Sequence, residues 1–204
     1  RALGRSARGK FWRCLCLSLY PGKNLGAAGD AGIVTTNNKD LYDRLLKLRN
    51  LGSVEKHKHV IRGGNHRLDT IQAIILNEKI KYIDKWNQSR RDVVDKYENL
   101  IDNPDVKLPE CPPKCTPVHH VYPVLVENRD SFTAHLDAKG IQWGMHYCVC
   151  IEEMDMYTHL SNPNEKAIDF SNHMVSLPIH PFMSGAEVEY LCEAINNYRG
   201  ENRD

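Results

Sequence analysis

The sequence predicts an α/β fold followed by a smaller α+β domain in the C-terminal part of the chain. Short apolar runs bounded by turn residues, such as residues 14–20, have the length of buried strands rather than helices. Apolar side chains then recur at helical spacing over residues 68–100, and a proline-rich segment, residues 103–117, follows. Beyond it, short strand-like and helix-like units alternate. We therefore divide the chain into residues 1–103, which end in the long helix, and residues 104–204, the small α+β domain.

The N-terminal part is predicted to contain two strands and a helix around a glycine-rich turn. The first strand, residues 14–20, ends in a Pro-Gly turn, and the second covers residues 31–36. The Asn-Asn pair after the second strand is a good N-cap signal for a helix that runs to about residue 50. The stripe over residues 68–100 is long for a helix of a globular protein, so we expect a bend in it.

The C-terminal part is predicted to begin with a strand, a helix and a second strand, at residues 118–127, 130–139 and 140–147. Two helices follow, at residues 165–175 and 184–198. Ser184, with acidic residues in the turn after it, marks the start of the last helix.

Composition and charge exclude several classes of protein. With 204 residues, 41% hydrophobic and 26% charged, the chain is typical of a globular protein that buries a core. The formal net charge of +1 gives no indication of a nucleic-acid or membrane partner, and the basic segment 1–13 lacks the interleaved aromatic residues of a nucleic-acid site. No apolar run has the length of a membrane span or of a signal-peptide core. We therefore expect a cytoplasmic protein.

The cysteines are expected to be reduced and to bind no metal. An odd count of seven, without a secretion signal, favours free thiols. The chain has two Cys-x-Cys pairs and one Cys-x-x-x-Cys pair, but it lacks the paired Cys-x-x-Cys knuckles of structural zinc sites. We interpret the cysteines as buried or incidental thiols: Cys14, Cys16, Cys111, Cys115, Cys148, Cys150 and Cys192.

Lys23 is the candidate catalytic residue. It follows the first predicted strand and its turn, at the kind of strand exit where open α/β sheets place their ligands. A nucleophilic lysine needs partial desolvation or a neighbouring cation, so that its neutral amine is available. Ser18 and Asn24 supply a hydroxyl and an amide nearby, and the glycines let backbone amides approach an anion. Taken alone, this pattern also suits a solvated loop lysine, and it lacks the spacing of a nucleotide P-loop.

A family resemblance extends this local pattern over most of the chain. The stretch SLYPGKNLGAAGDAGIVTTNN resembles the segment around the pyridoxal phosphate (PLP) lysine in the DegT/DnrJ/EryC1/StrS family of sugar-nucleotide aminotransferases. Four further blocks are similar to family segments and follow in the family's order. They are LLKLRNLGS, GGNHRLDTIQAIIL, GIQWGMHYCVC and SLPIHPFMSGAEVEYLCEAI.

The resemblance implies a PLP-dependent transferase of fold type I, in which residues 1–103 would be part of the large PLP-binding domain. Lys23 would bind PLP and carry the proton in catalysis. Ser18 matches the serine that binds the cofactor phosphate, and Asn65 matches an asparagine that reaches the phosphate from the neighbouring subunit. His146 and Tyr147 match a His-Tyr pair at the nucleotide-sugar edge of the site.

The implied reaction moves an amino group from glutamate to the keto carbon of a nucleotide-linked sugar, in a homodimer with a shared site.

The roles of two further pairs of residues are less clearly defined by the resemblance. Arg67 and Asp69 suit a direct role in the site, and equally an ion pair and cap at the start of a helix. His180 and Pro181 are interpreted as turn and packing residues.

Two departures from the family pattern support a different hypothesis. The family's HYPxPxH pattern reads HYCVCIE here, so both prolines and the second histidine are absent. In the family, most of the PLP-binding domain also precedes the lysine, including the acidic residue that holds the ring nitrogen protonated. The alternative is therefore a catalytically inactive remnant, or an interaction partner of a complete subunit.

Overall fold

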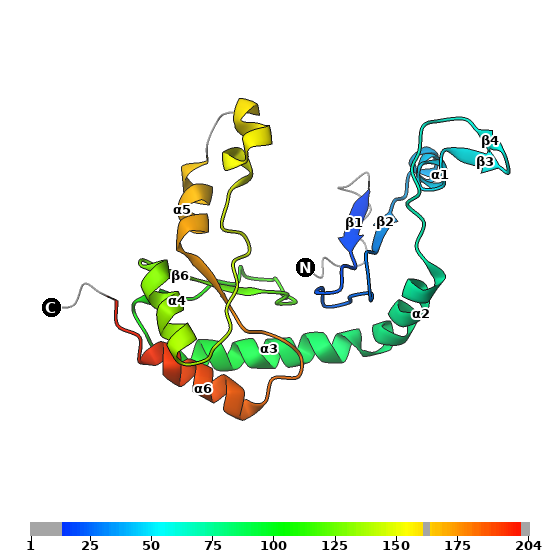
Figure 1. Cartoon of the computed structure of the whole chain (residues 1–204). Helices are drawn as coiled ribbons and strands as arrows, with labels where there is room; N and C mark the ends of the chain where they lie inside the picture. Colours follow the sequence, from blue (N-terminus) through cyan, green and yellow to red (C-terminus); the bar gives the residue numbers. More distant parts are fainter. Residues whose placement is uncertain (1–13, 161–163, 201–204) are drawn as a thin grey trace. The chain divides into compact units, whose positions relative to one another are not determined.

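The computed structural model describes residues 14–160 and 164–200, which fall into two compact units, residues 1–85 and residues 86–204 (Figure 1). The basic segment 1–13 lies outside the described residues. The domain boundary predicted after residue 103 refers to the domains of a larger protein and not to these two units. It therefore stays a prediction.

The first unit begins with the two strands that the sequence predicts. β1 (Leu15–Ser18) pairs antiparallel with β2 (Gly32–Thr35), in a register that sets Leu15 opposite Thr35. Apolar side chains on both faces of this pair are exposed, among them Leu17 at 47% and Val34 at 46%. Apolar residues on both faces are typical of strands that are covered on both sides of a sheet.

The helix after β2 starts where its cap was predicted. α1 (Lys39–Leu48) is capped by Asn38, whose Oδ1 accepts a hydrogen bond from the backbone N–H of Leu41 at 2.8 Å. A short hairpin of β3 (Ser53–Glu55) and β4 (Lys58–His59) follows. The sequence analysis missed this hairpin, because strands of three and two residues are too short to show alternation.

The long predicted helix is interrupted, as expected from its length. It consists of α2 (Thr70–Lys79), one 3₁₀ turn, η1 (Ile80–Tyr82), and α3 (Ile83–Leu100). The helical pattern is thus interrupted at residues 80–82, and the bend itself stays a prediction. The residues of η1 include neither proline nor glycine, so its position could not be read from the usual helix breakers.

The second unit is a three-stranded antiparallel sheet packed against helices. The strand order is β5 (Val106–Lys107), β6 (Tyr122–Val126) and β7 (Met174–Leu177). One hydrophobic core joins the sheet to α3, α4 (Arg129–Ala138) and α6 (Gly185–Asn196). Its fully buried side chains include Tyr97, Val124, Phe132, Val175 and Ile195. This α+β arrangement agrees with the prediction for the C-terminal part.

One predicted element of this unit is wrong, and another ends earlier than predicted. Residues 140–147 do not form a strand: only Gly144 pairs, through two backbone hydrogen bonds of 3.1 and 2.7 Å with Ser176. The predicted helix at residues 165–175 stops early, because α5 (Glu165–His173) is followed at once by β7. Ladder pairing with β6 and burial of β7 override the helical pattern there. Two 3₁₀ segments, η2 (Ile151–Glu153) and η3 (Asp155–Leu160), were not predicted.

A reciprocal capping box fixes the start of α6. The backbone N–H and the hydroxyl of Ser184 donate to Glu187 Oε2 at 2.7 and 2.8 Å, and Ser184 Oγ accepts from the N–H of Glu187 at 3.2 Å. The hydrogen bonds from the backbone and then the side chain of Ser184 lower the pKa of the Glu187 carboxyl. The predicted N-cap at Ser184 is therefore confirmed.

This box gives a prediction for pH. The folded pKa of Glu187 lies below its ordinary value of 4.5, so its contribution to stability is present above that value and is lost as the pH falls through the folded pKa. The destabilisation caused by Glu187→Gln should therefore shrink as denaturant unfolding is repeated from neutral to acidic pH. Glu193→Gln, on the same helix beyond its first turn, is the matched control and should show little effect at any pH. If Glu187→Gln lowers the free energy of unfolding equally at every pH, the capping box does not lower the pKa of Glu187.

Candidate active site

Lys23 lies in a tightly closed turn directly after β1. Its backbone N–H donates to the carbonyl oxygen of Tyr20 at 2.8 Å. On either side of the turn, Leu19 N–H donates to Ala31 O at 3.0 Å, and Ala27 N–H donates to Leu19 O at 2.8 Å. The chain that leaves β1 is thus tied to the chain that returns toward β2, and the backbone that carries the lysine is fixed at both ends.

Helix α2 holds this loop in place from the side. The N–H of Ala28 donates to Gln72 Oε1 at 2.8 Å, and Lys79 Nζ donates to the carbonyl oxygen of Gly26 at 2.7 Å. A small hydrophobic cluster of Leu19, Ala27 and Leu76 lies beneath these contacts. At Gly26 an added Cβ would lie 2.2 Å from the Pro21 carbonyl oxygen, so only glycine fits the turn.

Ser18 ends β1 and belongs to the same loop as Lys23. Its Oγ accepts a hydrogen bond from Tyr20 N–H at 3.3 Å, which leaves the hydroxyl proton to donate elsewhere. Ser18 is exposed and Lys23 is half-buried. A primary amine can bond to the aldehyde of PLP, and a hydroxyl can donate to its phosphate, so this pair fits the cofactor that the resemblance implies.

Asn65 comes from a separate segment of the first unit. Gly64 N–H donates to Leu48 O at 3.0 Å and His66 N–H to Arg49 O at 2.9 Å, so this segment lies along the end of α1. Asn65 itself forms a backbone bridge with Asn50, and it is exposed. Within residues 14–160 and 164–200, no hydrogen bond joins Asn65 to the loop of Lys23.

The neighbouring Arg67 and Asp69 do not form the ion pair that was considered. Arg67 Nη1 donates to Asn50 Oδ1 at 2.8 Å, within the same turn region. Asp69 occupies the N-cap position of α2, but its side chain makes no capping hydrogen bond. Arg67 therefore helps to fix the segment that presents Asn65.

His146 and Tyr147 lie together in the second unit, whereas Ser18, Lys23 and Asn65 belong to the first. His146 Nδ1 is 3.0 Å from Ser176 Oγ, and Ser176 on β7 is only 3% exposed. The Tyr147 ring packs edge-on against the His146 ring at a centroid distance of 5.8 Å, and Tyr147 is 71% exposed. The two rings are thus presented at the surface, with the imidazole held by a buried hydroxyl.

The sequence analysis did not single out Ser176 as a candidate, although it opens the Ser-Leu-Pro block of the resemblance. Its backbone is fixed by β6 on one side and by Gly144 on the other, which places its hydroxyl beside His146. To predict the contact between Ser176 and His146, one would need to know that Gly144 pairs with Ser176. These two residues lie 32 positions apart in the sequence. Such a contact is not visible in a local pattern.

Substitution of Ser176 tests this arrangement. A neutral hydrogen bond of about 0.5–1.5 kcal/mol selects which ring nitrogen of His146 carries the proton. Ser176→Ala should therefore shift the tautomer ratio of His146 several-fold, as measured from its ring ¹⁵N chemical shifts. The His173 ring, whose Nδ1 contacts the Asp169 carbonyl oxygen at 2.8 Å, is the internal control and should not change. An unaltered His146 ratio would show that Ser176 does not orient the ring.

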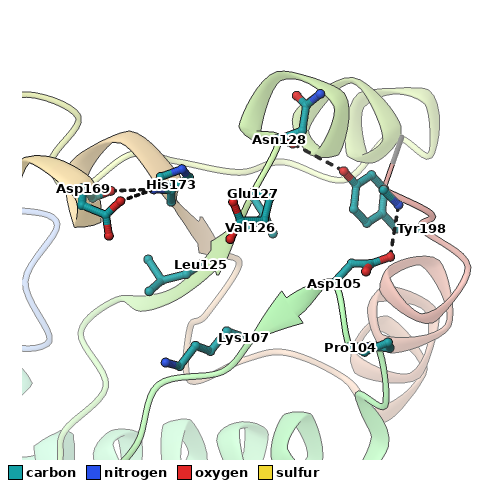
Figure 2. A pocket seen from close by; sticks show the side chains of 11 residues that line it. Pro104, Asp105, Lys107, Leu125, Val126, Glu127, Asn128, Asp169, His173 and Tyr198 are labelled. Carbon is teal, nitrogen blue, oxygen red and sulfur yellow. Dashed lines mark hydrogen bonds and ion pairs between the residues drawn. The ribbon is translucent and has the colours of Figure 1, made fainter. Parts of the chain in front are cut away.

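A separate cavity of about 580 Å³ lies in the second unit, between the edge of the sheet and α5 (Figure 2). Its lining includes Lys107, Leu125, Asp169, His173 and Tyr198, and none of the predicted site residues. The His173–Asp169 contact of 3.1 Å lies within α5. The cavity thus adds no group to the chemistry of Lys23.

Two general features can be stated for the part of the chain that the structure describes. No three His, Cys, Asp or Glu side chains there are placed to share a metal ion. No helix in that part is long and apolar enough to cross a membrane.

Solved structures with this fold are aminotransferases. DesV from S. venezuelae, in complex with a ketimine intermediate, superposes with a TM-score of 0.85 at 36% identity, over 90% of this chain and 50% of that one. A DegT DnrJ EryC1 StrS aminotransferase from Brucella abortus superposes with a TM-score of 0.84 at 30% identity, over the same shares. The predicted fold class is confirmed: the chain carries part of a PLP-dependent aminotransferase fold.

Sequence comparison leads to the same class. The model of the DegT/DnrJ/EryC1/StrS aminotransferase family matches residues 2–196, so the chain belongs to this family. A dTDP-3-amino-3,4,6-trideoxy-alpha-D-glucose transaminase from Streptomyces venezuelae is 36% identical over 89% of the chain. A dTDP-3-amino-3,6-dideoxy-alpha-D-galactopyranose transaminase from Aneurinibacillus thermoaerophilus is 40% identical over 89% of the chain. The chain spans about half the length of these curated relatives, 49% and 55% respectively.

Proposed function

We propose that this chain is part of a PLP-dependent aminotransferase that moves an amino group from glutamate to the keto carbon of a nucleotide-linked sugar. The observation that carries the proposal is the fixed turn after β1, which presents Lys23 beside Ser18 in a chain of this family. Relatives named as transaminases of dTDP-linked amino sugars support the substrate class.

Lys23 has two tasks in the proposed mechanism. Its Nζ would be the group that holds PLP covalently. With the amino donor in the site, the neutral Nζ would act as the base that accepts the proton from the substrate carbon and then as the acid that donates it. PLP, when bound, supplies the electron sink for this chemistry. Because the loop is tied to β2 and α2, the amine returns to nearly the same position for each transfer.

The remaining site residues bind and orient. Ser18 would donate its hydroxyl to the cofactor phosphate, and Asn65 of a second copy of the chain would add an amide donor to the same phosphate. His146 and Tyr147 contact the nucleotide-linked sugar, with the imidazole oriented by Ser176. A homodimer with shared sites follows from the role of Asn65.

The proposed architecture is a large PLP-binding domain that includes residues 1–103 and a small domain of residues 104–204. Exposed apolar side chains in the first unit support a larger domain around it. They include Leu17 and Ile33 on the strand pair, and Ile71 and Ile74 on α2, which are 64% and 63% exposed. We place the protein in the cytoplasm, with no nucleic-acid or membrane partner.

The alternative proposal is a catalytically inactive remnant or an interaction partner of a complete subunit. One observation favours it: Cys148 and Cys150 stand where the family pattern has prolines, and the segment 146–149 is exposed. Loss of two fixed φ angles loosens the backbone that would frame the substrate.

A turnover assay separates the two proposals. The 204-residue chain would be mixed with PLP, glutamate and a 3-keto sugar nucleotide, alone and together with a polypeptide that corresponds to the unmatched half of its relatives. We call the second mixture the reconstituted protein. Amino-sugar formation by the reconstituted protein supports the aminotransferase. Absence of product, although the cofactor is bound covalently, favours the inactive alternative.

A further inference from the structure

Cys115 ends a sharp turn in the second unit, and Cys111 directly precedes that turn. The N–H of Cys115 donates to the carbonyl oxygen of Pro112 at 3.2 Å, which closes a four-residue turn. Pro113 takes the second position, and Lys114 takes the third with φ of 64°. Proline at the second position and positive φ at the third are the pattern of a type II turn, and Pro113 favours this reversal.

The turn brings the two cysteines together. Cys111 Sγ lies 3.6 Å from the carbonyl oxygen of Cys115 and 3.6 Å from that of Pro112. The first and last residues of the turn, Pro112 and Cys115, lie within about 7 Å of each other. Cys111 directly precedes Pro112, and its Sγ reaches the backbone of Cys115, which is the closeness that a disulfide requires. Cys111 is exposed and Cys115 is half-buried, so an oxidant can reach the pair.

The other cysteines are less suited to pairing. Cys16 lies on β1 and Cys14 precedes the strand, so the extended residue between them holds their Cα atoms about 6.6 Å apart, near the upper limit for a disulfide. The Cys150 thiol is directed to Ser171 Oγ at 3.5 Å. Cys192 is 2% exposed, and burial raises the pKa of its thiol to about 11.

We infer that Cys111 and Cys115 form a redox-active dithiol that closes to an intramolecular disulfide with hydrogen peroxide as oxidant. The thiolate of Cys111 attacks a peroxide oxygen, which gives a sulfenic acid and hydroxide. The thiol of Cys115 then attacks that sulfur and displaces a second hydroxide, and the two thiol protons convert both hydroxides to water. Two thiols and one peroxide thus give one disulfide and two waters. Reversible disulfides of this kind occur in reducing compartments as redox sensors.

Peptide mapping tests the inference, because Lys114 separates the two cysteines. The 204-residue chain is treated with one equivalent of hydrogen peroxide, alkylated, and digested with trypsin without reduction. Closure should link peptide 108–114 to peptide 115–129, and reduction should release both. The pairs Cys14–Cys16 and Cys148–Cys150 each lie within a single tryptic peptide and should be recovered largely alkylated. If residues 111 and 115 are recovered alkylated separately while another pair is oxidised, the inference is wrong.

A variant of the turn tests whether the backbone geometry, and not only the exposure of the two thiols, favours the disulfide. Pro113→Gly keeps both thiols but frees the backbone of the turn, so the equilibrium constant for closure against glutathione should fall about two- to fivefold. Cys111→Ser should abolish the linked peptides and leave the secondary structure unchanged. A closure constant that is equal in Pro113→Gly and the unmodified chain would contradict the role of the turn.

Discussion

Lys23→Ala is expected to abolish covalent attachment of PLP and to lower the rate of amino transfer by about 10²–10⁴-fold in the reconstituted protein. The physical reason is that the same Nζ both holds the cofactor and moves the proton. The visible absorbance band of lysine-bound PLP should disappear, whereas non-covalent binding through Ser18 should persist in part. Absorbance spectra and single-turnover rates with the sugar nucleotide measure the two effects separately.

Lys39→Ala is the matched control for this substitution. Lys39 lies at the start of α1, forms an exposed ion pair with Asp43, and has a side chain that is 77% exposed. An exposed pair contributes little to stability, so the absorbance band and the rate should both be unchanged. If Lys23→Ala leaves the band intact, or if Lys39→Ala removes it, the assignment of Lys23 is wrong.

Phe132→Ala is expected to destabilise the second unit by about 3–5 kcal/mol. Phe132 on α4 is fully buried, and its ring packs edge-on against Tyr198 at a centroid distance of 4.9 Å. Truncation removes the buried ring and leaves a cavity between the sheet and its helices. Denaturant unfolding followed by circular dichroism should show a much lower midpoint, or loss of the cooperative transition if the unit is only marginally stable.

Phe182→Ala is the control for this loss of a large aromatic side chain. Phe182 is 72% exposed, and its ring packs edge-on against the Trp86 ring at a centroid distance of 6.1 Å. Since little area is removed from water there, its substitution should change the midpoint only slightly. Equal effects of the two substitutions would show that the core described for this unit does not stabilise it.

Local signals in the sequence predicted the parts of the fold that local chemistry decides. The caps at Asn38 and Ser184 were read correctly, because a side-chain acceptor next to free backbone N–H groups acts within one turn of helix. The strand that precedes Lys23 was also placed correctly, since a short apolar run before a Pro-Gly turn leaves few options. The resemblance then gave the fold class, which local patterns alone left open.

Contacts between distant segments account for what was missed. Residues 174 and 175 read as the end of a helix, but pairing with β6 makes them the start of a buried strand. Residues 140–147 read as a strand, but only Gly144 finds a partner. Both errors concern the surroundings of Ser176, and for that reason its contact with His146 could not be foreseen. The residues at Lys23 could be predicted because their turn closes within a few positions of the chain.

The most direct test of the central claim is to find which lysine PLP modifies. The reconstituted protein is incubated with PLP, reduced with borohydride and digested with trypsin. Trypsin does not cleave after a pyridoxyl-lysine, so modification of Lys23 predicts one peptide of residues 14–39 that carries the pyridoxyl group. Recovery of an unmodified peptide of residues 14–23, with the label on another lysine, would contradict the proposed site.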